Sequence, residues 1–203
     1  MAVMATQRGD KQARRRDILE AGRAELRAGG LAGMQMRQVA RRAGVALGTV
    51  YTYFATKEAL YATLYAEALD RMLADVERAL VEKAGDPEEM FVAFASCYRE
   101  MYAEFGKELD VFTMLGSKTQ LDPDVLAQLV EATTRLMNII RQAMADYEVE
   151  RPDLTLVLLW STASGLAEHF TGPRHIFHGL SWDDTVRYAA HTFARSLLPI
   201  RKT

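Results

Sequence analysis

The sequence predicts an all-α protein in which a small helix-turn-helix unit is followed by a larger helical body. Apolar residues recur at helical spacing along most of the 203-residue chain, and strand-like alternation is scarce. Glycine, proline and helix-capping residues separate the periodic segments. Between Met34 and Leu60 the chain reads as two short helices around a glycine turn, followed by the start of a third.

The first three helices are short or end at glycine. A helix is expected over residues 10–28, ending at Gly29 and Gly30. Two short helices follow over residues 36–43 and 47–54. Gly44 lies at the turn between them, where glycine adopts a positive φ without steric cost.

The later helices begin at recognisable caps. Thr56 is expected to cap a long helix over residues 57–85, and its apolar side chains recur at every fourth position on one face. Asp86 with Pro87, and Ser181 with the acids after it, mark two further starts. The remaining helices are expected over residues 86–105, 107–115, 122–148, 152–171 and 181–199, with a loop over 173–180, which makes about nine helices.

The charge is distributed unevenly. Residues 1–57 carry 11 Lys and Arg against 4 Asp and Glu, a net charge of +7, while the rest carries 14 against 23, a net charge of −9. This predicts a polyanionic partner for the first part only. The Arg14-Arg15-Arg16 run suits phosphate neutralisation, although such a run by itself is also typical of a solvated surface.

The segment from Val39 to Leu60 resembles the DNA-reading motif of the TetR family of transcriptional repressors. The resemblance is carried by Val39, Ala40, Ala43, Gly44, Val45, Gly48, Thr49, Val50, Tyr51, Tyr53, Phe54, Thr56, Lys57, Glu58 and Leu60. So many fixed spacings rarely arise by chance. Ala46 stands where the family usually has Ser, and Gln35 where it commonly has Thr, so two capping hydroxyls are missing.

The resemblance implies a DNA-binding domain over residues 1–57, with a basic N-terminal arm, and a ligand-binding and dimerisation domain over residues 58–203. In helix-turn-helix proteins the second helix enters the major groove, so its exposed residues are candidates for base contacts. For Tyr53, core packing is the simpler explanation. The candidate DNA-contacting residues are Arg14, Arg15, Arg37, Gln38, Leu47, Gly48, Thr49, Tyr51, Tyr53 and Lys57.

The body is rich in aromatic and methionine residues at helical spacing, which are typical of apolar ligand pockets. Packing of a plain core explains such a stripe about as well. A small hydrophobic ligand is expected, with no cofactor. The candidate ligand-binding residues are Phe91, Phe94, Tyr98, Met101, Phe112, Met137 and Trp160.

By resemblance, a homodimer through the last two helices binds a palindromic double-stranded DNA operator and is released by the ligand. The run WSTASGLA from Trp160 permits close approach of a partner helix. A monomeric helical core would use similar residues. The expected interface residues are Leu158, Ser161, Gly165, His169, Val186, Ala190, Phe193 and Leu197.

Other function classes find little support. No phosphate-binding loop, nucleophile elbow or HExxH motif is present, so no catalytic residue is predicted.

His169, His175 and His178 lack a suitable set of further ligands, so a loop or interface role is favoured over a metal site. The single cysteine, Cys97, fits a core position better than a redox sensor. No membrane span or signal peptide is evident, and we expect a cytoplasmic protein. The alternatives are a ligand-independent DNA-binding protein and a helical enzyme.

Overall fold

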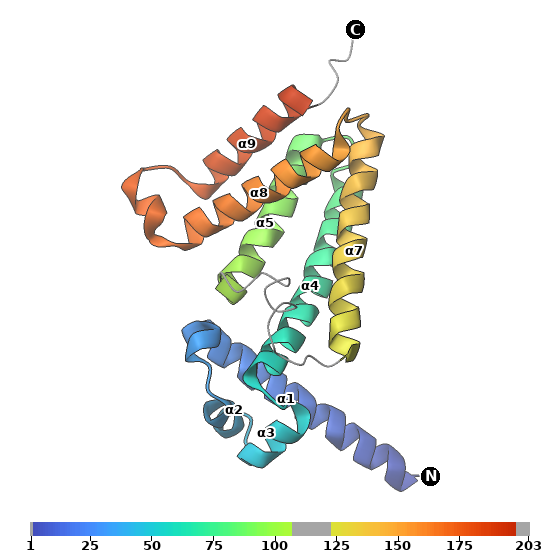
Figure 1. Ribbon diagram of the computed structural model, residues 1–203, viewed down its shortest axis with the longest axis vertical. Coiled ribbons are helices and arrows are strands. Elements are labelled where there is room, and N and C mark those ends of the chain that lie inside the picture. Colours follow the sequence, from blue (N-terminus) through green and yellow to red (C-terminus); the bar gives the residue numbers. More distant parts are fainter. Residues whose placement is uncertain (1, 107–122, 198–203) are drawn as a thin grey trace. The chain divides into compact units, whose positions relative to one another are not determined.

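The computed structural model describes residues 2–106 and 123–197, and the side chains of 10–106 and 123–196 among them. This part of the chain contains eight α-helices, one 3-10 helix and no strand, so the all-α prediction is confirmed (Figure 1). The helices are α1 (Ala2–Gly33), α2 (Met36–Arg42), α3 (Leu47–Tyr53), α4 (Lys57–Glu82), α5 (Pro87–Phe105), α7 (Pro123–Asp146), α8 (Pro152–Thr171) and α9 (Trp182–Leu197), and the 3-10 helix is η2 (Pro173–Phe177). The helix predicted over residues 107–115 lies outside the described residues.

Two local predictions are wrong. Helix α1 begins at Ala2 rather than near residue 10, and helical residues continue to Gly33 past Gly30, whose φ of 63° interrupts the helix. Its first turns contain alanine, methionine and glutamine, which favour helix without any apolar periodicity. The predicted loop after α8 contains the 3-10 helix η2, and Pro173 at its first turn holds a helical φ.

The predicted caps are confirmed. The hydroxyl of Thr56 accepts a hydrogen bond from the N–H of Ala59 at 3.0 Å, and a carboxylate oxygen of Asp86 accepts one from Glu89 at the same distance. The hydroxyl of Ser181 accepts the N–H of Asp184 at 3.0 Å. These bonds satisfy N–H groups of the first helical turn and therefore set where each helix begins. Helices α2 and α3 begin without a side-chain cap, as Gln35 and Ala46 imply.

The described chain forms two compact units, and α4 and α7 each contribute to both. The N-terminal unit contains the chain up to Glu67 and the part of α7 up to Gln128. The C-terminal unit contains Ala68 to Gly106 and the chain from Leu129 onward. The predicted functional boundary between residues 57 and 58 stays a prediction, because this division reflects packing alone.

The N-terminal unit is held together by small and branched apolar side chains. Ile18 of α1, Val39 of α2 and Val50 of α3 are fully buried, and every residue from Leu60 to Ala66 of α4 is buried. Gly22 permits a close approach of α1 and α4, since a Cβ at this position would lie 3.0 Å from a methyl carbon of Leu60. These contacts orient the first turns of α4 against α1.

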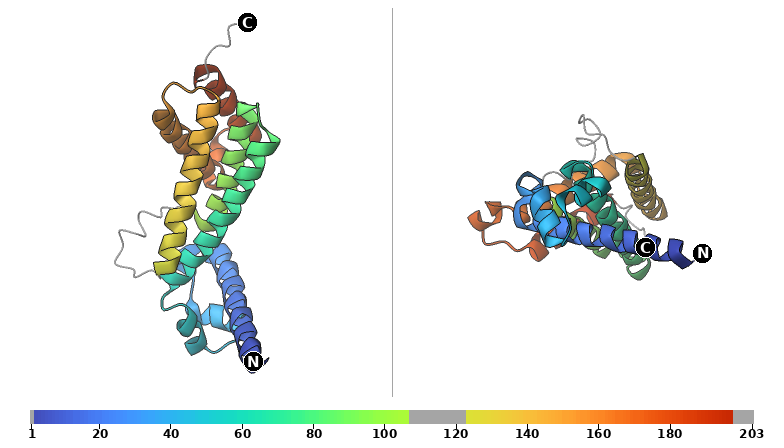
Figure 2. Two further views of the ribbon diagram at one scale, coloured as in Figure 1. Left: turned by 90° about the vertical axis from the view of Figure 1, so that its right-hand side faces the viewer. Right: turned by 90° about the horizontal axis from the view of Figure 1, so that it is seen from below.

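The C-terminal unit is organised around α5, which packs against both α8 and α9 (Figure 1). The later turns of α4 and of α7 run side by side in both views (Figure 2), and an ion pair between Glu77 and Arg135 joins them. The inward side of α5 carries Phe91, Phe94 and Tyr98, all buried. The aromatic stripe predicted from the sequence therefore lies between helices.

Candidate nucleic-acid interface and ligand cavity

Helices α2 and α3 form a helix-turn-helix in the N-terminal unit (Figure 1). Gly44 adopts a φ of 65°, and the N–H of Val45 donates to the carbonyl of Ala40 at 3.0 Å, which closes the turn. Val39, Ala40 and Val50 are buried. Burial of these residues leaves the opposite side of α3 at the surface.

A surface groove gathers candidate residues from three helices. It is lined by Gln35, Met36, Arg37, Leu47, Tyr51, Ala55, Thr56 and Lys57. The structure therefore brings together Arg37 of α2, Leu47 and Tyr51 of α3, and Lys57 at the start of α4. Tyr51 is 48% exposed, which is high for an aromatic residue.

Next to Leu47, Gly48 is exposed, and a Cβ added there would meet no protein atom within 4 Å. Its carbonyl accepts a hydrogen bond from the hydroxyl of Thr52 at 2.9 Å. Thr49 is half-buried. The backbone at Gly48 is thus open to a molecule outside the unit.

Three of the candidate DNA contacts also have partners within the N-terminal unit. The hydroxyl of Tyr53 donates to the carbonyl of Lys11 at 3.3 Å, and Nζ of Lys57 donates to the carbonyl of Leu31 at 3.2 Å. Arg15 lies 3.9 Å from Glu67 and its guanidinium 5.6 Å from the ring centre of Phe54. These side chains help to hold α3 and α4 against α1. A role in DNA binding stays a prediction for each of them.

The other candidates differ in exposure, and part of the basic charge is neutralised locally. Arg14 and Arg37 are exposed, and Gln38 is half-buried. Arg23 pairs with Glu67 at 3.0 Å, and Arg42 with Glu25 at 3.0 Å. Glu25 is already counted in the net charge of +7 over residues 1–57, whereas Glu67 lies outside this range and lowers the positive charge that is free to meet phosphates.

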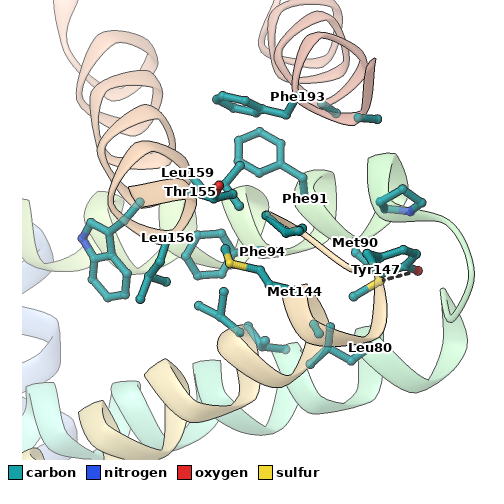
Figure 3. A pocket seen from close by; sticks show the side chains of 18 of the residues that line it. Leu80, Met90, Phe91, Phe94, Met144, Tyr147, Thr155, Leu156, Leu159 and Phe193 are labelled. Atoms are coloured by element: carbon teal, nitrogen blue, oxygen red, sulfur yellow. Dashed lines mark hydrogen bonds between the residues drawn. The ribbon is translucent and has the colours of Figure 1, made fainter. Parts of the chain in front are cut away.

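The C-terminal unit contains a cavity of about 110 Å³ between α4, α5, α7, α8 and α9 (Figure 3). Of the predicted ligand-binding residues, Phe91, Phe94 and Trp160 line it. Phe94 lies 6.0 Å from Trp160, and Phe91 meets Phe193 edge-on at 5.2 Å between ring centres. The cavity wall is almost entirely apolar.

The other predicted ligand-binding residues do not line this cavity. Tyr98 is buried behind Trp160, with ring centres 5.5 Å apart. Met101 is buried on α5, Met137 is half-buried on α7, and Phe112 lies outside the described residues. Ligand binding by any of these residues stays a prediction.

Several lining residues were missed in the sequence. Leu156 and Leu159 continue the apolar spacing of α8, so helical periodicity could have indicated them. Met90, Met144, Tyr147 and Thr155 give no such signal, because their position beside the cavity depends on how the helices pack. Tyr147 accepts a hydrogen bond from the N–H of Gly85 at 2.9 Å and donates to Sδ of Met90 at 3.3 Å (Figure 3).

The exposure of residues on α8 and α9 tests which of the predicted interface residues can meet a second chain. Leu158, Ser161 and Gly165 of α8 are exposed, and His169 is half-buried. On α9, Val186 and Ala190 are 0% and 2% exposed, so assigning them to an interface with a second chain is wrong. Phe193 lines the cavity instead. The apolar side of α9 is covered by α5 of the same chain.

His169 at the end of α8 and two histidines of the segment before α9, His175 and His178, pack around Phe170. The rings of His169 and His178 stack with centres 4.8 Å apart, and their Nε2 atoms are in contact. Nδ1 of His175 lies 2.8 Å from the carbonyl oxygen of Gly172. Among the residues that the structure describes, no three His, Cys, Asp or Glu side chains are placed to share a metal ion.

Cys97 on α5 is half-buried. Burial, and then the nearby carboxylates of Asp75 and Glu100, raise the pKa of its thiol to about 11. A redox-sensing cysteine requires the opposite shift, because the thiolate is the reactive form. No helix within residues 2–106 and 123–197 is long and apolar enough to cross a membrane.

Comparison with known proteins agrees with these observations. Residues 18–64 match the model of the bacterial regulatory proteins of the tetR family. A helix-turn-helix followed by a helical body defines the class of helical transcription regulators. The matched segment runs from α1 into α4 and includes the whole helix-turn-helix. Over residues 18–64 the chain thus belongs to the TetR family of transcriptional regulators, as its sequence motif indicated.

The relatives extend this likeness to different degrees. The HTH-type transcriptional repressor KstR of Mycolicibacterium smegmatis is 42% identical over 66 residues, 32% of this chain and 32% of that protein. The match thus spans about a third of the curated relative. A transcriptional regulator from Rhodococcus sp. Rha1 has a TM-score of 0.70 and 20% identity, over 90% of this chain and 96% of that chain. FadR from Bacillus subtilis, solved in complex with stearoyl-CoA, has a TM-score of 0.56 and 18% identity, over 90% and 96% of the two chains. At these identities the two structures show a shared fold.

Proposed function

We propose that the protein is a ligand-responsive transcriptional repressor that binds a palindromic operator as a homodimer, and that it is not an enzyme. The observation that carries the proposal is the groove where Arg37, Tyr51 and Lys57 come together next to the open backbone of Gly48. Cations and hydroxyl groups around such a groove suit phosphate contacts, and the exposed side of α3 suits the major groove.

A homodimer is supported by the outer face of α8. Leu154, Val157 and Leu158 are 55%, 62% and 48% exposed, and Gly165 on the same helix leaves room for a partner. A contiguous apolar surface of this kind is typical of a protein interface. Two identical helix-turn-helix units would also account for specificity, because one such small unit contacts few bases.

A ligand response is supported by the apolar cavity of the C-terminal unit. The structurally similar FadR of Bacillus subtilis was solved with stearoyl-CoA, which has a long apolar chain. A ligand that binds one conformation better than another shifts the population toward it by its differential affinity. Release from the operator follows if the favoured conformation binds DNA less well.

The proposal is tested by fluorescence anisotropy on an operator selected from random DNA by the protein itself. Thr49→Ala is expected to cost about 1–3 kcal/mol on the operator and little on random DNA if Thr49 meets a base edge. Arg37→Ala is expected to weaken both complexes about equally and to lower the slope of affinity against salt by about one unit. Arg37 is preferred to Lys57 for this comparison, because Lys57 also bonds the carbonyl of Leu31.

Two outcomes would contradict parts of the proposal. Unchanged operator affinity in both variants would remove the groove and α3 as the DNA-binding surface. Equal losses for Thr49→Ala on operator and random DNA would make Thr49 a backbone contact. The ligand response is contradicted if apolar compounds that bind the cavity leave operator affinity unchanged.

A further inference from the structure

The lining of the cavity excludes a charged group from its interior. Its residues are aliphatic, aromatic or sulfur-containing apart from Thr155, Tyr147 and the indole of Trp160, and none of them carries a charge at neutral pH. An ionised group moved into such surroundings without a partner loses its hydration and costs several kcal/mol. The part of a ligand that enters the cavity is therefore uncharged.

Thr155 is the unusual residue of this lining. It is 5% exposed, and within the described chain only Thr63 is a comparably buried polar residue. Thr63 donates its hydroxyl to the carbonyl of Ala59, four residues earlier, at 2.9 Å. Thr162 and Thr192 make the same bond to Leu158 and Tyr188, each at 2.8 Å.

The hydroxyl of Thr155 makes no such bond to Arg151 and has no hydrogen-bond partner among the described residues. Its side chain borders the cavity beside Phe91 (Figure 3). The hydroxyl oxygen is not among the fully enclosed side-chain atoms that lack a hydrogen bond in the described chain, so it keeps accessible surface at the cavity wall. A water can bond to it there until a ligand replaces that water. A hydroxyl in this position is available to a polar group of a ligand that enters the cavity.

The second hydroxyl of the lining is already engaged. Tyr147 accepts the N–H of Gly85 at 2.9 Å and points its own proton at Sδ of Met90 (Figure 3). It therefore bridges the turn after α4 and helix α5. Thr155 is the lining hydroxyl that has both its donor and its acceptor capacity unused.

We propose that Thr155 recognises the ligand by donating a hydrogen bond to an acceptor oxygen on an otherwise apolar, uncharged molecule, such as a ketone or ester carbonyl. This inference rests on the proposed ligand response and specifies its chemistry. The apolar wall supplies most of the affinity through buried area, and the single hydroxyl selects for the oxygen. Any charged portion of a larger ligand stays outside the cavity.

The test compares 2-acetylnaphthalene with 2-ethylnaphthalene, which have nearly the same shape but differ in one carbonyl oxygen. Binding to the full-length protein is followed by tryptophan fluorescence in a Trp182→Phe background, so that the signal comes from Trp160, which lines the cavity. Thr155→Val keeps the branched shape and removes the hydroxyl. We expect it to weaken binding of the ketone about tenfold and to leave binding of the hydrocarbon unchanged. Tyr147→Phe, the matched control, is expected to change the two affinities equally.

The thermal midpoint of each variant without compound gives an independent readout. Thr155→Val should leave the midpoint nearly unchanged, since the hydroxyl bonds no group of the described chain and a methyl group takes its place at an apolar wall. A clear fall would show that this hydroxyl has a partner in the free protein, which overturns the inference. The inference is also overturned if Thr155→Val affects both compounds equally, or if Tyr147→Phe shows the ketone-specific loss. In those cases hydrocarbon binding to the wild type still supports the cavity. If neither compound binds the wild type, the inference and the proposed ligand response both fail.

Discussion

Replacement of Gly48 by alanine separates the stability of the protein from its binding to DNA. An alanine Cβ at this position would meet no protein atom within 4 Å, and Gly48 lies inside the helical span of α3 without a positive φ. Alanine is favoured over glycine within a helix by up to about 1 kcal/mol, because the unfolded glycine chain has more conformational freedom. The first helical turn reduces this gain. We expect the free energy of unfolding to rise by about 0–1 kcal/mol, or the thermal midpoint by up to about 4 °C.

The same methyl group is expected to weaken operator binding at least tenfold, which corresponds to about 1.4 kcal/mol. The reason is steric: if α3 enters the major groove, the open backbone at Gly48 is where the duplex comes closest. The assay pairs thermal unfolding with anisotropy titration of the operator at one fixed salt concentration, because affinity for DNA depends on salt.

Gly29→Ala is the matched control. Gly29 is also an exposed helical glycine of the N-terminal unit, and a Cβ there would also meet nothing within 4 Å. It should raise stability by a similar amount and leave operator affinity unchanged. Wild-type operator affinity in Gly48→Ala would refute the close approach of α3 to DNA. A loss of stability in Gly48→Ala would refute the structural argument, since nothing in the protein opposes the methyl group.

Two further predictions concern the C-terminal unit. Val157→Asp on the exposed face of α8 should shift the protein from dimer to monomer in sedimentation equilibrium, whereas Val81→Asp, at a 79% exposed position on α4, should not; dimers that persist in Val157→Asp would exclude this face. Cys97 should react with a disulfide reagent about 100-fold more slowly at pH 7.5 than a thiol with an unshifted pKa, because its pKa is raised from 9.0 to about 11. The labelling rate should keep rising with pH up to that value, and a rate that levels off near pH 9 would contradict the shift.

The helix starts and the helix-turn-helix were largely predictable because their signals are local. Thr56, Asp86 and Ser181 cap helices through bonds that reach only three residues along the chain. Gly44 adopts the positive φ that its place in the turn requires. A motif built from such short-range constraints can be recognised in one sequence, and the match over residues 18–64 confirms the tetR-family motif of this segment.

The cavity was predictable only in part. Helical spacing marks Phe91, Phe94 and Tyr98 as one apolar face, and all three are buried. Spacing cannot tell which of them borders an empty volume and which packs behind another ring, as Tyr98 does behind Trp160. That difference depends on the angles at which α5 and α8 meet, which no local pattern encodes.

The sequence by itself determined the helices, their caps, the helix-turn-helix and the uneven charge, because each follows from interactions within a few residues or from composition. Only the tertiary structure decided which neighbour each apolar face meets. It places Val186 and Ala190 in the buried core rather than at an interface. It also pairs Arg23 and Arg42 with glutamates and places the hydroxyl of Thr155 at a cavity wall. The physical reason is that hydrophobic burial is non-directional: a sequence shows that a face must be covered, and packing selects what covers it.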